Sequence, residues 1–124
     1  MAMTNAQWIN HQNAIKALSN LFHDNAVEKG FYDDIDPDRV RDVLSVVTKI
    51  HEELGEVTQA LSRQRPRESP KIEGFTELEE ELADTFIRLL DFVGAFVDPA
   101  TFAAAVRAKH EYNTLRPYRH GKAA

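Results

Sequence analysis

Two pairs of acidic residues are the part of this sequence best suited to chemistry. Glu53 and Glu56 are three positions apart, and Glu81 and Asp84 repeat that spacing further along the chain. Residues three apart on a helix lie on one face, so each pair can reach a common ligand. If the two helices pack together, the carboxylates converge, and each pair of like charges at about 4 Å then repels by roughly 4 kcal/mol. A divalent cation removes this repulsion, and an all-oxygen ligand set predicts Mg²⁺, with Mn²⁺ as the second choice.

The acidic pairs also have an ordinary explanation, because exposed helix faces commonly carry solvated carboxylates. The position of Glu53 favours the metal site. At about 100° per residue, Glu53 falls about 60° from Ile50, which belongs to the apolar face of its helix, whereas Glu52 falls about 160° away, toward solvent. We therefore expect Glu53 to border the core, and both explanations stay open at this point.

Four helices must position these side chains. Segments containing proline or glycine divide the chain at residues 30–38, 65–74 and 94–99. The first helix, at about residues 5–29, is inferred from apolar spacing. Three later helix starts carry capping signals, which are Asp36 before Pro37, Thr76 followed by Glu79, and Asp98 before Pro99. No segment alternates apolar and polar residues as an exposed strand would. The sequence predicts a single all-α domain over residues 1–124, a four-helix, bundle-like fold.

The second and third helices have the clearest apolar faces. On the second helix this face comprises Val40, Val43, Leu44, Val47, Ile50, Leu54, Val57 and Leu61. On the third helix it comprises Leu78, Leu82, Phe86, Leu89 and Val93, with a polar row beside it made of Glu77, Glu81, Asp84, Arg88 and Asp91. Packing through these faces would bring the two acidic pairs together at the edge of the core.

Composition excludes several classes of function. The 20 acidic and 15 basic residues give a net charge of −5, which argues against binding a nucleic acid polymer or an anionic membrane surface. The absence of cysteine excludes a thiolate nucleophile and cysteine-ligated metals. The most apolar stretch, residues 89–106, is interrupted by Asp91, Asp98 and Pro99, so no membrane-spanning segment is expected. With no signal-peptide pattern at the start, we expect a cytoplasmic protein.

Sequence motifs of other enzyme classes are missing. The chain has no GxGxxG, Walker A or GxSxG motif. No Glu or Asp is followed three residues later by His, which weakens a di-iron interpretation.

The segment Glu52-Glu53-x-x-Glu56, followed by Glu81-x-x-Asp84, resembles the EExxE…ExxD signature of the MazG-like, all-α nucleoside triphosphate pyrophosphohydrolases. The end of the chain is similar to that of several members of this family, with Asn113, Arg116-Pro117 and His120-Gly121-Lys122. The resemblance implies a helical bundle that uses Mg²⁺ to hydrolyse a nucleoside triphosphate to the monophosphate and pyrophosphate. It also implies a metal site made of Glu53, Glu56, Glu81 and Asp84, with Glu52 as an outer contact.

Further roles can be assigned to residues around the acidic pairs. Either Glu52 or Glu53 could accept a proton from the attacking water, and the sequence does not choose between them. The candidates for binding phosphate are Lys49, Arg88, Asn113, Arg116, Arg119 and Lys122, and those for stacking on the base are Trp8 and His23. Each has a simpler explanation, since Lys49 and Arg88 could form helical ion pairs with Glu53 and Asp84, and aromatic residues are usually core.

Two other functions remain compatible with this sequence. One is a phosphoribosyl-ATP pyrophosphohydrolase, which shares the general fold of the family. The other is a non-catalytic, acidic helical module that binds another protein. For the enzyme, the resemblance implies a dimer or a dimer of dimers, so we expect a homodimer or homotetramer. Apolar surface beyond the face that meets the acidic site favours a symmetric oligomer, and it comes from Phe92, Phe96, Val97 and Phe102. The alternative is that these phenylalanines fill the chain's own core.

Overall fold

The computed structural model describes residues 2–122, which form four α-helices and one short 3₁₀ turn. The elements are α1 (Asn5–Glu28), α2 (Val40–Leu61), α3 (Glu77–Phe96), α4 (Pro99–Thr114) and η1 (Tyr118–Gly121). Among the described residues, strand-like pairing is limited to one bridge between Glu68 and Thr76. The predicted all-α class is confirmed. Within residues 2–122, none of the helices has the length and apolar character needed to cross a membrane.

Side-chain caps explain where three of the helices begin. The Thr76 hydroxyl accepts the backbone N–H of Glu79 at the start of α3, and the Asp98 carboxylate accepts that of Thr101 at the start of α4. Both starts agree with the sequence prediction. Helix α1 has a capping box made by Thr4 and Gln7, which apolar spacing alone does not reveal.

The predicted cap at Asp36 is wrong. Helix α2 begins at Val40, and its N-cap, Arg39, makes no side-chain capping hydrogen bond. The Asp36 carboxylate instead accepts the backbone N–H of Asp38, two residues later, at 2.9 Å. This local bond stabilises the turn before the helix, which explains how an Asp-Pro pair can carry a capping signal without capping α2.

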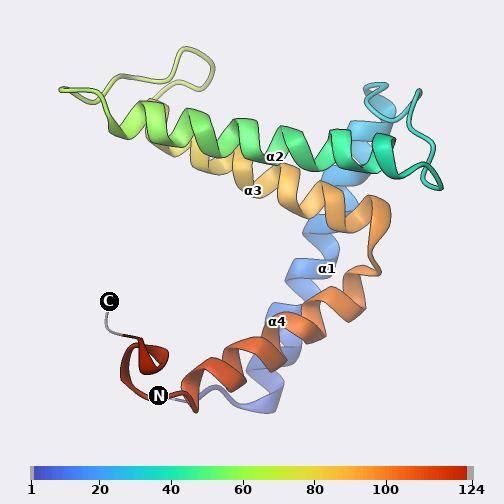
Figure 1. The fold of residues 1–124 in the computed structure, drawn as a ribbon, viewed down its shortest axis with the longest axis vertical. Helices are drawn as coiled ribbons and strands as arrows, with labels where there is room; N and C mark the ends of the chain where they lie inside the picture. Colours follow the sequence, from blue (N-terminus) through green and yellow to red (C-terminus); the bar gives the residue numbers. More distant parts are fainter. Residues whose placement is uncertain (1, 123–124) are drawn as a thin grey trace.

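The helices are arranged as two antiparallel pairs that meet at a corner (Figure 1). Helices α2 and α3 lie side by side, α4 packs along α1, and α1 crosses α3. The two pairs diverge away from the crossing, so the chain forms an open, bundle-like arrangement (Figure 1). A short link explains this shape, since Val97 is extended and α4 begins at Pro99, where the chain turns back along α1.

Helices α1 and α3 approach closely where Ser19 meets Gly94. Ser19 is completely buried, and its hydroxyl donates to the Ile15 carbonyl oxygen at 2.8 Å. A Cβ atom added at Gly94 would lie 2.6 Å from the Ser19 carbonyl oxygen and 2.7 Å from the His23 Cβ. Glycine is therefore required at this crossing, because a larger residue would force the helices apart.

The apolar faces of α2 and α3 are only partly covered. Seven residues predicted to face the core are between 42% and 72% exposed, and they are Val40, Leu44, Leu54, Leu61, Leu82, Phe86 and Leu89. The buried apolar residues are few, comprising Trp8, Val46, Leu90, Val93 and Ala103. The prediction of a continuous buried stripe is wrong because α2 has α3 as its principal neighbour, and one neighbouring helix cannot cover a whole face.

The phenylalanines that we expected to form an interface between subunits are instead partly covered by their own chain. Phe92, Phe96 and Phe102 are half-buried within the chain, and the ring centroids of Phe92 and Phe96 are 5.0 Å apart. Of this group, Val97 is exposed. Large exposed apolar side chains lie on all four helices, and those on α2 and α3 include Leu44, Leu54, Leu82 and Leu89.

The crossing of α1 and α3 can be tested by substituting glycine. We expect Gly94→Ala to lower the free energy of unfolding by about 1–3 kcal/mol, because the new methyl group meets a backbone oxygen that cannot move independently. Gly55→Ala, in the interior of α2, is the control, since its Cβ would have nothing within 4 Å. It should raise stability by up to about 1 kcal/mol through helix propensity. Urea unfolding measures the free energy of unfolding of both variants. Equal changes in the two variants would contradict the close crossing.

Candidate functional site

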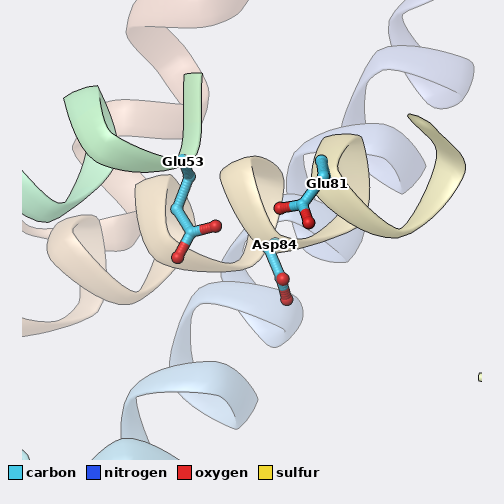
Figure 2. A group of neighbouring side chains, drawn as sticks. All are labelled: Glu53, Glu81 and Asp84. Carbon is cyan, nitrogen blue, oxygen red and sulfur yellow. The ribbon is translucent and has the colours of Figure 1, made fainter. Parts of the chain in front are cut away.

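Three carboxylates from two helices converge between α2 and α3. Glu53 on α2 and Glu81 and Asp84 on α3 each place one oxygen within 4.8 Å of the others (Figure 2). The antiparallel pairing of the two helices brings the middle of α2 next to the second turn of α3. The i, i+3 spacing then presents Glu81 and Asp84 on the same face of α3. We call these three residues the acidic cluster.

Glu56 adds a fourth carboxylate beside the acidic cluster. The pKa of Glu81 is raised to about 7, mainly by burial and further by hydrogen bonding with Glu56 and by the negative charges of Glu56, Glu80 and Asp84. Ionising Glu81 among these neighbours is costly, as expected for carboxylates that share one site. All four residues singled out as metal ligands are therefore near one another.

The donor atoms of the acidic cluster fit a hard cation. Glu53 Oε2 and Glu81 Oε2 are buried, and neither has a hydrogen-bond partner within residues 2–122. A buried carboxylate oxygen without a partner is costly, and a divalent cation would satisfy several such oxygens at once. The other oxygen of Glu53 accepts a hydrogen bond from Arg88 Nε at 2.7 Å. Glu53 is 12% exposed at its side chain, which confirms that it borders the core.

A cavity of about 270 Å³ opens beside the acidic cluster. Glu53 and Asp84 line it together with three cationic side chains, those of Lys49, Lys71 and Arg88. Its apolar wall is made by Phe22, Phe31, Ile35, Val46 and Ile87. The pocket thus combines positive charge for an anion with aromatic and aliphatic surface for a flat apolar group.

A buried carboxylate holds the wall of this pocket next to α1. Asp91, 8% exposed, pairs with His23 Nδ1 at 3.0 Å and accepts a hydrogen bond from the Tyr32 hydroxyl at 2.7 Å. Burial and this hydrogen bond raise the pKa of the Tyr32 hydroxyl, so it remains a donor. Tyr32 and Asp91 line the pocket. His23, predicted to stack on the base, does not line it and instead bonds to Asp91.

Other residues predicted for the site lie elsewhere in the chain. Trp8 is buried near His110, with ring centroids 5.6 Å apart, and the Arg107 guanidinium lies over its ring. It therefore packs between α1 and α4 and does not line the pocket beside the acidic cluster. Glu52 is exposed and belongs neither to the acidic cluster nor to the pocket lining.

The C-terminal candidates also lie away from the acidic cluster in this chain. Asn113 lies in the last turn of α4, and Arg116, Arg119 and Lys122 belong to the segment after it, which lies near the start of α1 (Figure 1). None of them lines the pocket. Arg116 lies near the Tyr112 ring, and Arg119 lies near the Tyr118 ring. Within a single chain, the residues that could meet a phosphate at the acidic cluster are thus Lys49, Arg88 and Lys71.

Sequence reasoning missed Lys71 and the role of Asp91. Asp91 continues the polar row of Glu81, Asp84 and Arg88, so helical spacing already carried a signal for it. Lys71 lies in the loop between α2 and α3, where no periodicity indicates which way a side chain points.

Comparisons with protein-family models, with curated proteins and with solved structures found no match to this chain.

The raised pKa of Glu81 predicts that the stability of the fold depends on pH. Because this pKa rises from 4.5 to about 7 in the folded chain, ionisation costs the folded state more than the unfolded state. In metal-free buffer, the protonated Glu81 side chain should contribute its full stabilisation below about pH 4.5. This stabilisation should be lost as the pH rises toward 7. Mg²⁺ binds the ionised form, so the rise in melting temperature that it causes should grow over the same range.

Glu81→Gln is the matched variant for this measurement. It should flatten the pH dependence of the melting temperature between these limits and remove most of the Mg²⁺ effect. Wild-type and variant curves that run parallel, with equal Mg²⁺ effects, would rule out Glu81 as the titrating ligand.

Proposed function

We propose that this chain is a magnesium-dependent nucleoside triphosphate pyrophosphohydrolase, which cleaves a ribo- or deoxynucleoside triphosphate to the monophosphate and pyrophosphate. The observation that carries the proposal is the convergence of Glu53, Glu81 and Asp84 beside a pocket with cationic and aromatic walls. These residues belong to the segments that resemble the EExxE…ExxD signature. Carboxylates, cations and an apolar wall are the parts that a metal-assisted reaction on a nucleotide needs.

Glu53, Glu56, Glu81 and Asp84 would hold Mg²⁺, and Mn²⁺ would suit the same oxygen ligands. When bound, the metal supplies charge neutralisation and Lewis-acid activation of a phosphoryl group and water. Lys49 and Arg88 would bind the phosphates. Arg88 pairs with Glu53 at 2.7 Å. A cation on Glu53 would compensate this carboxylate and leave the Arg88 guanidinium available for a phosphate oxygen.

Proton transfer from the attacking water requires a carboxylate close to the reacting centre. Glu53 lies in the acidic cluster, whereas Glu52 is exposed on α2 outside it. Geometry therefore favours Glu53 as the proton acceptor over Glu52. The apolar wall of the pocket, which includes Phe31 and Ile35, would receive the nucleobase or the sugar.

Removal of non-standard nucleotides from the cytoplasmic pool is the role that we propose for this activity. A panel of canonical and modified nucleoside triphosphates, assayed for Mg²⁺-dependent pyrophosphate release, tests it. Phosphoribosyl-ATP belongs in the panel because selective turnover of it would identify the alternative enzyme. No turnover of any substrate would favour the non-catalytic module. Release of orthophosphate through a diphosphate intermediate would contradict the proposed reaction.

Substitutions in the acidic cluster should separate catalysis from folding. We expect Glu53→Gln and Asp84→Asn each to lower kcat/KM by on the order of 10²-fold or more, because each removes a charged metal ligand without adding bulk. Helical content measured by circular dichroism should stay the same. Glu28→Gln, at the end of α1, is the control for the same chemical change and should keep full activity. Near wild-type turnover in either cluster variant would refute the metal assignment.

We also propose that the active form is a homodimer or homotetramer. The half-exposed apolar side chains on α2 and α3, including Leu44, Leu54, Leu82 and Leu89, support this proposal because such surface commonly marks an interface. Sedimentation equilibrium at micromolar concentration should give the mass of a dimer or a tetramer of the 14.1 kDa chain. A fully active species with the monomer mass would refute it.

A further inference from the structure

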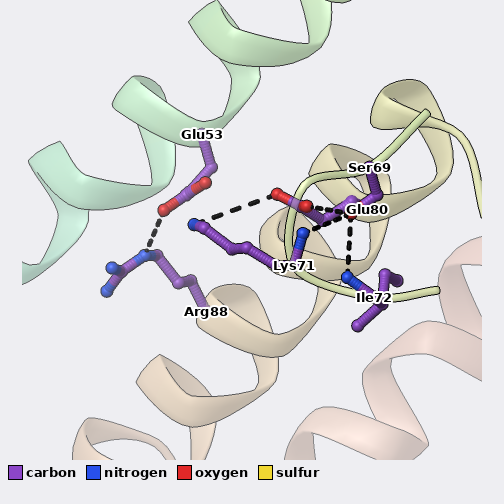
Figure 3. Close-up of polar contacts among 6 residues, drawn as sticks. All are labelled: Glu53, Ser69, Lys71, Ile72, Glu80 and Arg88. Carbon is purple, nitrogen blue, oxygen red and sulfur yellow. Dashed lines mark hydrogen bonds and ion pairs between the residues drawn. The ribbon is translucent and has the colours of Figure 1, made fainter. Parts of the chain in front are cut away.

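A buried glutamate fixes the loop between α2 and α3 to the first turn of α3. Glu80 is 5% exposed, and its carboxylate accepts a hydrogen bond from the Ser69 hydroxyl (Figure 3). The Ser69 oxygen in turn accepts the backbone N–H groups of Lys71 at 3.1 Å and Ile72 at 3.0 Å. This arrangement joins a side chain of α3 to Ser69 and, through its hydroxyl, to the backbone of Lys71 and Ile72 near the middle of the loop.

Backbone hydrogen bonds hold both sides of the same loop. The Ser69 N–H donates to the Phe75 carbonyl oxygen, and the Glu77 N–H donates to that of Arg67, both at 2.8 Å. Arg63, just after α2, pairs with Glu77 at 2.6 Å. The loop backbone therefore has a defined conformation, which fixes the position from which the Lys71 side chain extends.

Lys71 extends from this loop toward Glu53 and Arg88 (Figure 3). It lines the same pocket as Lys49 and Arg88, so cations from the loop, α2 and α3 meet at one cavity. Its Nζ lies 3.9 Å from Glu80 Oε2, and its side chain is 73% exposed. An ion pair this long and exposed contributes little stability. Glu80 has Ser69 as a closer partner, so Lys71 can leave it for another anion at small cost.

We propose that Lys71 is a phosphate-binding residue of this pocket, and that Ser69 and Glu80 are positioning residues that direct it there. The inference rests on the proposed function for the identity of the anion, a nucleoside triphosphate. It adds an element that the acidic motifs do not contain, a cation from the loop between α2 and α3 that lines the same pocket as the cations of the two helices. An ammonium group is a suitable partner for phosphate because it donates charge-assisted hydrogen bonds from any direction.

Steady-state kinetics on the Mg²⁺-loaded full chain test the role of Lys71. We expect Lys71→Gln to raise KM, and the dissociation constant of a non-hydrolysable imidotriphosphate analogue, about tenfold or more. Lys71→Arg keeps the charge and should restore binding to within about threefold of wild type. Lys16→Gln, an equal loss of charge on α1 near Asp98, is the matched control and should change neither value.

A second comparison separates positioning from direct contact. Ser69→Ala removes the link to Glu80 but keeps the Lys71 charge, so it should weaken analogue binding less than Lys71→Gln does. In the double variant, Ser69→Ala should have no further effect, because it acts through Lys71. Mg²⁺ affinity, measured by titration without nucleotide, should stay the same in all of these variants. A merely structural role for the loop would instead change metal affinity and give additive effects.

The outcomes distinguish this inference from the proposed function. Pyrophosphate release by the wild type, with KM and analogue binding unchanged in Lys71→Gln, would overturn the role of Lys71 and leave the proposed function intact. Analogue binding that depends on Lys71, without pyrophosphate release from any triphosphate, would support the phosphate contact and overturn the proposed function. A wild-type chain that does not bind the analogue would overturn both.

Discussion

Repulsion among carboxylates packed between α2 and α3 is the constraint on which the rest of this structure depends. Acidic side chains on α3 face inward at successive turns, and each needs a compensating partner. Glu77 pairs with Arg63, Glu80 with Ser69 and Lys71, and Asp91 with His23 and Tyr32. The partners come from the end of α2, the loop and α1. Several tertiary contacts of α3 thus compensate carboxylates that are partly or fully buried.

The acidic cluster is where this compensation is incomplete. Arg88 satisfies one oxygen of Glu53, while Glu53 Oε2 and Glu81 Oε2 remain buried without a partner in the described part of the chain. The raised pKa of Glu81 has the same origin, since ionisation there meets burial and neighbouring negative charge. Elsewhere along α3 the protein supplies its own donors. For the carboxylates that lack them, the counterpart that we propose is a divalent cation from solution.

The same inward-facing polar row explains the unusual distribution of apolar surface. Because α3 directs Glu80 and Asp91 into the interior, part of its apolar face, including Leu82 and Leu89, remains half-exposed. Helix α2 packs mainly on α3 and leaves Leu44 and Leu61 exposed as well. On α3, the burial of Glu80 and the exposure of Leu82 and Leu89 are therefore linked, because at about 100° per residue these leucines lie on the face opposite Glu80.

The sequence by itself determined the helical class, the capped starts of α3 and α4, and the acidic pairs that share a helix face. These features depend on residues three or four positions apart, where covalent geometry controls the neighbours. Only the tertiary structure decided that Glu53, Glu81 and Asp84 converge, that Trp8 packs against α4, and that the chain's own C-terminal cations lie elsewhere. It also brought Lys71 to the pocket through hydrogen bonds between the loop and α3. Such placements depend on contacts between distant segments and on loop conformation, neither of which leaves a periodic pattern in the sequence.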